Sequence, residues 1–250
     1  MSLLQVQDVS KHFGKLVAVN GVTLTIEPGE LRAVIGPNGA GKTTFFNLIS
    51  GFFPPTSGRI VFQGRDITEL PEHKRVKQGM ARTFQVTEIF PELTVRENIR
   101  VAVEVADGRR MSPWLSKANR TRLEGRVIEL MDMGGIAPMA DRLVGELSHG
   151  DQRATEIMMS LALNPKLLLL DEPTAGMGDQ ETFHVTKLIR KLHREQKLSI
   201  ILIEHDMRVI FHLADRIMVL AEGAPLAEGT PDEIANDERV QAAYLGKEHA

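Results

Sequence analysis

The chain has 250 residues, enough for one large α/β domain with a sizeable buried core. Its net charge of −3 does not favour a nucleic-acid-binding polycation, and its lack of cysteine excludes disulfides, thiolate metal sites and thiol nucleophiles. The longest apolar runs fall far short of the roughly 18 residues that a membrane span needs. We therefore expect no nucleic acid partner, and a membrane role only through another protein.

The N-terminal part of the chain predicts short strands around a glycine-rich segment. Alternating or continuous apolar side chains indicate these strands, and the last apolar run before the glycines leads directly into GPNGAGKTT at residues 36–44. Residues 45–49 then continue as a helix, with Gly51 as its C-terminal stop. Strands are expected at residues 3–9, 22–26, 33–35 and 59–62.

The middle of the chain predicts helices. Thr94 and Glu97 have the spacing of a capping box that opens a helix. A second helix is indicated by apolar residues at helical spacing, and it ends at Gly134. We interpret residues 90–163 as a mostly helical insertion, with a polar, basic loop at residues 107–119.

The C-terminal half predicts buried strands that alternate with helices. Residues 167–170, 200–203 and 217–220 are continuous apolar runs, the pattern of strands covered on both faces. Residues 185–192 present one apolar helix face. This alternation predicts a parallel sheet of the doubly wound type.

Gly36, Gly41, Lys42 and Thr43 match the complete Walker A pattern G-x4-G-K-[ST]. Glycines let the backbone curl around a phosphate chain and expose its amides, and the following helix adds its positive N-terminal end. Lys42 can reach the β- and γ-phosphates, and the Thr43 hydroxyl can ligate Mg²⁺. A glycine-rich turn of no function is the alternative, but the strand before and the helix after disfavour it.

Asp171 and Glu172 directly follow the apolar run at residues 167–170. Asp171 would lie beside Mg²⁺, and Glu172 could polarise an attacking water. Taken alone, the same residues fit a buried strand capped by exposed acids equally well. Together with an upstream phosphate loop, hydrolysis is the better interpretation.

An ordered set of phrases, GPNGAGKT, ARTFQ, LSHGDQR, LLLLDEPT and IEHD, resembles the ATP-binding cassette (ABC) family. The resemblance extends from Val9 to about Ile234. It implies a single cassette over residues 1–250, with a RecA-like P-loop NTPase α/β core, an antiparallel β subdomain and an α-helical subdomain. It also implies ATP hydrolysis as the activity, with ATP and Mg²⁺ as cofactors.

The resemblance implies a role for each matching position. Phe13 falls where the family stacks an aromatic ring on adenine, Gln85 where a glutamine reaches Mg²⁺ and water, and His205 where a histidine contacts the γ-phosphate. The implied catalytic residues are Glu172, His205 and Gln85, and the implied Mg²⁺ ligands are Thr43, Gln85 and Asp171. The other implied nucleotide contacts are Gly36, Pro37, Asn38, Gly39, Ala40, Gly41, Lys42 and Thr44. Without this context, Phe13 and Gln85 would be interpreted as core packing and an inert loop residue.

Ser148 and Gly150 fall in the family's signature loop, where a hydroxyl, an amide and a helix N-terminus form a second anion site. In the family this site binds the γ-phosphate of ATP held by a second cassette. His149 and Asp151 replace the glycine and glutamine of the commonest signature. The family's dimer-interface aspartate falls on Gly178, with Asp179 one place later.

The finer resemblance is to the ATPases of branched-chain amino acid importers, through GFFPPTSGRIVFQGRDIT, ARTFQ, IEHDM and GTPDEI. It implies transmembrane permease subunits, a second nucleotide-binding subunit (identical or a paralogue) and, indirectly, a periplasmic or extracellular substrate-binding protein. The cassette would lie peripherally on the cytoplasmic face of the inner membrane.

Other functions remain as alternatives. Urea-type importer ATPases and lipopolysaccharide-export ATPases share most of these phrases. A soluble cassette acting on DNA or ribosomes would usually have a second cassette or a long coiled-coil or basic insertion, and the middle segment of this chain is too short and insufficiently basic. A P-loop GTPase should carry an Asn-Lys-x-Asp motif, which the sequence lacks, and neither a GTPase nor a small-molecule kinase needs LSHGDQ.

Overall fold

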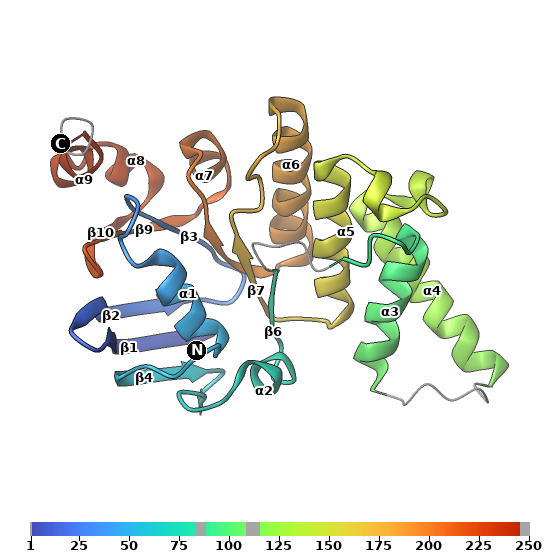
Figure 1. The fold of residues 1–250 in the computed structure, drawn as a ribbon, viewed down its shortest axis with the longest axis horizontal. Coiled ribbons are helices and arrows are strands. Elements are labelled where there is room, and N and C mark those ends of the chain that lie inside the picture. The colour runs from blue at the N-terminus through green and yellow to red at the C-terminus, as the bar shows by residue number, and fades with distance from the viewer. Residues whose placement is uncertain (1, 84–88, 109–115, 246–250) are drawn as a thin grey trace.

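The computed structural model describes residues 2–83, 89–108 and 116–245. Within them the strands form two sheets, one of four strands in the order β2-β1-β4-β5 and one of six in the order β10-β9-β3-β8-β7-β6 (Figure 1). The four-stranded sheet is antiparallel, whereas β9, β3, β8, β7 and β6 run parallel in the other. The predicted combination of a parallel α/β core with an antiparallel β part is therefore confirmed.

The antiparallel sheet begins with a long hairpin, whose register runs from Leu4 opposite Ile26 to Phe13 opposite Leu16. Both hairpin strands are longer than the alternating stretches predicted from the sequence, because several residues near the turn are exposed on both faces and show no alternation. The strands are β1 (Leu4–Phe13), β2 (Leu16–Ile26), β4 (Ser57–Phe62) and β5 (Arg65–Asp66).

The parallel sheet contains the strands that lead to the predicted chemistry. Every residue of β3, β7 and β8 is buried, and successive side chains enter opposite cores. Burial on both faces explains the continuous apolar runs. The strands are β3 (Leu31–Ile35), β6 (Met80–Arg82), β7 (Leu167–Asp171), β8 (Ser199–Ile203), β9 (Arg216–Ala221) and β10 (Ala224–Gly229).

Two hydrophobic cores hold the layers together. One joins the antiparallel sheet and helix α1 (Lys42–Ser50) to one face of the parallel sheet, and α1 lies between the two sheets in Figure 1. The other core covers the opposite face with helical segments. These are α5 (His149–Ala162), α6 (Asp179–Gln196) and α7 (Met207–Leu213). The remaining short elements are α2 (Glu72–Val76), η1 (Ala137–Met139), η2 (Val144–Glu146), α8 (Pro231–Ala235) and α9 (Glu238–Leu245).

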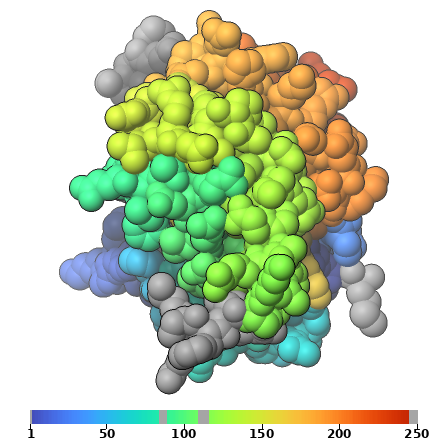
Figure 2. Space-filling model, turned by 90° about the vertical axis from the view of Figure 1, so that its right-hand side faces the viewer, coloured from blue at the N-terminus to red at the C-terminus, as the bar shows by residue number. Residues whose placement is uncertain are grey.

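Helices α3 (Val95–Asp107) and α4 (Lys117–Gly134) pack with α5 at the end of the molecule away from the hairpin, the face seen in Figure 2. The predicted capping box is confirmed: Thr94 Oγ1 accepts from the Glu97 amide at 3.2 Å, and Glu97 Oε2 accepts from the Thr94 amide at 2.8 Å. The boundaries of the helical subdomain at residues 90 and 163 stay a prediction.

Arg75 anchors the C-terminal end of α1, which the sequence did not suggest. Its side chain is 1% exposed and donates to four backbone carbonyls, two of which, those of Leu48 and Ile49, belong to the last turn of α1. Burial lowers the pKa of Arg75 to about 10. The guanidinium therefore donates to carbonyls that a helix end leaves without partners, and its positive charge interacts favourably with the negative end of the helix dipole.

Candidate nucleotide site

The phosphate loop connects β3 to α1 in a conformation that requires glycine. Gly36 and Gly41 have φ of 151° and 93°. A Cβ at Gly36 would lie 2.1 Å from the Leu220 carbonyl oxygen, and one at Gly41 would lie 2.4 Å from that of Ala18. Both the backbone angle and the space thus exclude a side chain at these positions.

Lys42 bends back over this loop. Its Nζ donates to the carbonyls of Gly36 at 2.7 Å and Pro37 at 3.2 Å. No side chain of the described residues caps α1, and its first turn contains no acidic residue. The positive end of the helix dipole therefore favours an anion at the start of α1.

Asp171 ends β7 and is fully buried. Its Oδ2 accepts from Arg82 Nη2 at 3.0 Å, whereas its Oδ1 is buried without a hydrogen-bond partner among the described residues. Burial raises the pKa of the Asp171 carboxyl, against the opposing effect of Arg82. A buried acceptor that lacks a hydrogen-bond partner in the described residues can be satisfied by a cation or a water molecule. Carboxylate and hydroxyl oxygens are ligands that Mg²⁺ prefers. The residues present therefore fit Mg²⁺.

Glu172 and His205 follow neighbouring strands and meet at the same edge of the sheet. His205 Nε2 lies 2.6 Å from Glu172 Oε1, and the Glu172 amide donates to the Ile203 carbonyl at 2.9 Å. Glu172 has φ of 46°, a strained conformation for a residue with a side chain. The carboxylate and the imidazole, 33 positions apart in the sequence, thus form one polar pair.

Phe13 ends β1 with a ring that is 47% exposed. The Phe53 ring meets it edge-on, with centroids 5.5 Å apart, and Lys11 Nζ lies 5.3 Å from its centroid. The same hairpin abuts the phosphate loop, since Ala18 lies against Gly41. A supported, half-exposed ring at this place can stack on a nucleobase.

The signature residues lie at the start of α5, and α1 and α5 lie on either side of β7 in Figure 1. Ser148 caps α5, and its Oγ donates to Asp151 Oδ2 at 2.8 Å. The Gly150 amide donates to Glu181 Oε1 at 3.3 Å. Hydrogen bonds from the Gly150 and Gly178 amides hold the pKa of Glu181 below its usual value. Carboxylates thus contact both groups predicted to meet a phosphate.

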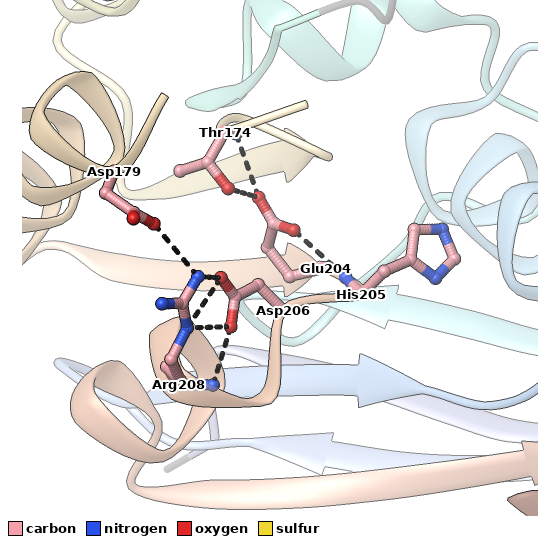
Figure 3. Close-up of polar contacts among 6 residues, drawn as sticks. All are labelled: Thr174, Asp179, Glu204, His205, Asp206 and Arg208. Atoms are coloured by element: carbon pink, nitrogen blue, oxygen red, sulfur yellow. Dashed lines mark hydrogen bonds and ion pairs between the residues drawn. The ribbon is translucent and has the colours of Figure 1, made fainter. Parts of the chain in front are cut away.

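One predicted site residue is not described by the structure, and one further residue, to which the sequence assigned no role, lies near the family's interface position. Gln85 lies outside the described residues. Asp179 is 89% exposed at its side chain, and its Oδ1 accepts from Arg208 Nη2 at 3.3 Å within the same chain (Figure 3). No dimer-interface role is assigned to Asp179, since the family's interface aspartate falls on Gly178.

A glycine-rich phosphate loop, a strand-end aspartate and a polar pair at the carboxyl edge of a parallel sheet define a P-loop nucleotide-binding protein. The sequence profile described as "ABC transporter" matches residues 19–175. The chain belongs to this family and is an ATP-hydrolysing cassette. Within the described residues, no helix is both long enough and apolar enough to cross a membrane.

Curated relatives match over almost their whole length. The chain is 40% identical to the high-affinity branched-chain amino acid transport ATP-binding protein BraF of Pseudomonas aeruginosa, covering 98% of each protein. It is 34% identical to the lipopolysaccharide export system ATP-binding protein LptB of Haemophilus influenzae, covering 99% of each. A second profile, "Branched-chain amino acid ATP-binding cassette transporter", matches residues 224–250.

Solved structures match the fold as a whole. A nucleotide-free ATP-binding cassette from an ABC transporter has a TM-score of 0.86 and 28% identity, covering 99% of this chain and 100% of that one. A dimeric cassette in a post-hydrolysis state bound to ADP and Pi has a TM-score of 0.76 and 25% identity, covering 91% and 98%. The predicted RecA-like P-loop fold is confirmed.

Proposed function

We propose that this cassette energises the import of branched-chain amino acids, with the residues at the carboxyl edge of the parallel sheet as its hydrolytic site. The observation that carries the site is the meeting of three features at one edge. They are the phosphate loop, the Asp171 oxygen that has no hydrogen-bond partner in the described part of the chain, and the Glu172–His205 pair. Each feature supplies one requirement of phosphoryl transfer to water.

The proposed roles follow from this geometry. Backbone N–H groups within residues 36–44 and the side chain of Lys42 hold the phosphates, and Phe13 stacks on adenine. Thr43, Gln85 and Asp171 would hold Mg²⁺, which would supply positive charge to the phosphate oxygens. Glu172 accepts a proton from the attacking water. His205, in contact with Glu172, orients that carboxylate and the γ-phosphate.

We further propose that two cassettes close around two nucleotides. Ser148 and Gly150 start a different helix from the one that follows the phosphate loop, which favours their use by the nucleotide of a partner. The carboxylates of Asp151 and Glu181 would have to release the Ser148 hydroxyl and the Gly150 amide on closure. The dimeric cassette with ADP and Pi supports this arrangement by analogy.

The partner that the cassette drives would be a transmembrane permease that binds the helical subdomain, residues 90–163. A hollow of about 660 Å³ lies between α3, α5 and the end of α1, and the exposed apolar side chains of Phe52, Phe90 and Val105 line it. An exposed apolar patch of this kind is typical of a protein-binding surface. The cassette would thereby lie on the cytoplasmic face of the inner membrane.

Amino acid import is favoured over lipopolysaccharide export by two observations. The identity to BraF is higher than that to LptB, and the C-terminal profile names branched-chain amino acid transport. The permease and a substrate-binding protein would choose the substrate. Urea-type import and lipopolysaccharide export remain the competing functions.

The substrate is tested by isolating the cassette together with its permease from source membranes and reconstituting the complex in vesicles. We expect leucine, isoleucine and valine, with the cognate binding protein, to stimulate Mg-ATP hydrolysis and to accumulate inside. Urea and lipopolysaccharide serve as the comparison substrates. Stimulation by either of these, with no response to leucine, would refute the import of branched-chain amino acids.

A further inference from the structure

Glu204 is a buried carboxylate that joins two loops at the hydrolytic edge. It directly follows β8, and only 4% of the residue is exposed. Its Oε1 accepts from the Thr174 amide at 2.8 Å and from the Thr174 hydroxyl at 2.5 Å, and its Oε2 accepts from the His205 amide at 2.9 Å (Figure 3). One carboxylate oxygen thus binds the loop that follows β7, and the other binds the next residue of its own loop.

The chemistry of this bridge requires a carboxylate. Both of its oxygens accept hydrogen bonds, whereas a glutamine amide of the same shape offers one acceptor and one donor group. Burying a carboxylate is unfavourable unless hydrogen bonds compensate for the lost water. In the described part of the chain, the groups that donate to Glu204 are N–H and O–H groups of these two loops. These hydrogen bonds therefore compensate for the burial of the side chain.

The two loops carry the proposed hydrolytic pair. Thr174 lies two residues after Glu172, and Glu204 binds the amide of His205 itself. The Glu172 backbone is strained, so contacts around it must hold its conformation. The contact between Glu172 Oε1 and His205 Nε2 depends on both loops keeping their relative position.

We propose that Glu204 is a positioning residue, which holds the His205 loop against the Glu172 loop so that the two side chains meet. The inference rests on the proposed roles of Glu172 and His205. Glu204 does not contact the reacting atoms in this assignment; it acts through His205. The alternative is that its hydrogen bonds stabilise the fold and leave the chemistry unaffected.

The test is Glu204→Gln, measured by steady-state hydrolysis and by thermal unfolding. We expect kcat to fall about 10- to 100-fold, since a misplacement of about 1 Å can cost about 100-fold, with KM for Mg-ATP within about threefold of wild type. Thr174→Val should lower kcat in the same direction because it removes one donor, and Thr174→Ser, which keeps the hydroxyl, should restore it. These threonine variants preserve the test if Glu204→Gln does not fold.

Asp215→Asn is the matched control. Asp215 also accepts from a backbone amide, that of Leu31 at 2.9 Å, but at the amino ends of the parallel strands, opposite the hydrolytic edge. We expect it to lower the melting temperature and to keep wild-type kcat. If Glu204→Gln behaves in the same way, with a lower melting temperature and unchanged kcat, the positioning role is overturned.

A double-mutant cycle separates action through His205 from an independent effect. In a His205→Ala background we expect Glu204→Gln to lower kcat by less than about threefold, because no imidazole is left to position. A full additional loss would overturn the proposal. If Glu172→Gln and His205→Ala lose turnover while Glu204→Gln keeps it, this inference alone fails. If Glu172→Gln keeps turnover, the proposed hydrolytic site fails, and the inference fails with it.

Discussion

Glu172→Gln is expected to bind Mg-ATP with nearly wild-type affinity and to hydrolyse it about 10²–10⁴-fold more slowly, the usual contribution of a general base. The substitution keeps the size of the side chain, and an amide can still form a hydrogen bond with His205, which lies 2.6 Å from the carboxylate. What the amide cannot do is accept a proton from water. Phosphate release at saturating Mg-ATP measures the rate, and calorimetric titration measures the binding.

The control is Glu129→Gln on α4, whose side chain is 57% exposed and pairs with Arg126. We expect it to change neither quantity, since exposed ion pairs contribute little. If Glu172→Gln turned over ATP at close to the wild-type rate, another group would have to take the proton. The assignment of the strained, His205-bound carboxylate as the base would then be wrong.

Arg75→Met is expected to lower the free energy of unfolding by about 3–5 kcal/mol, a loss typical of breaking a buried charged network. The substitution keeps much of the aliphatic stem but removes the donors to the carbonyls of Leu48, Ile49, Thr68 and Leu70. Each buried acceptor left without a donor costs about 1–3 kcal/mol, and local relaxation recovers part of the sum. Urea unfolding followed by circular dichroism measures the effect.

Arg59→Met is the matched control. Arg59 pairs with Asp66 on the antiparallel sheet, and its side chain is 57% exposed, so we expect a loss of no more than about 1 kcal/mol. Equal stability of the two variants would show that the Arg75 guanidinium contributes no more than a surface charge. Its proposed support of the phosphate-loop helix would then be lost.

The parts of the fold that the sequence predicted are those with a local pattern. The runs at residues 167–170 and 200–203 are continuous because both faces of β7 and β8 are buried, and Thr94 with Glu97 has a spacing that only a helix start requires. The hairpin strands were underestimated because their outer ends lack alternation. The phosphate loop was predictable because the backbone angles that require its glycines all lie within one short segment of the chain.

The contacts that organise the site have no local pattern. Arg82 and Asp171 are 89 positions apart, and Glu204 and Thr174 are 30 apart, so only the folded sheet brings them together. Arg75 lies among the charged residues of a short helix and gives no sign in the sequence of complete burial. The carboxylates of Asp151 and Glu181 at the signature groups were likewise visible only once α5 and α6 were packed.

The mass of Glu172→Gln in solution, with and without Mg-ATP, tests most directly the claim that two cassettes enclose ATP. Because hydrolysis is expected to release the pair, a variant that binds ATP without turning it over should accumulate in the closed state. We predict the mass of one 27.7 kDa chain without nucleotide and of two chains with it, by light scattering. A mass of one chain at saturating, demonstrably bound Mg-ATP would contradict the closure of two identical cassettes.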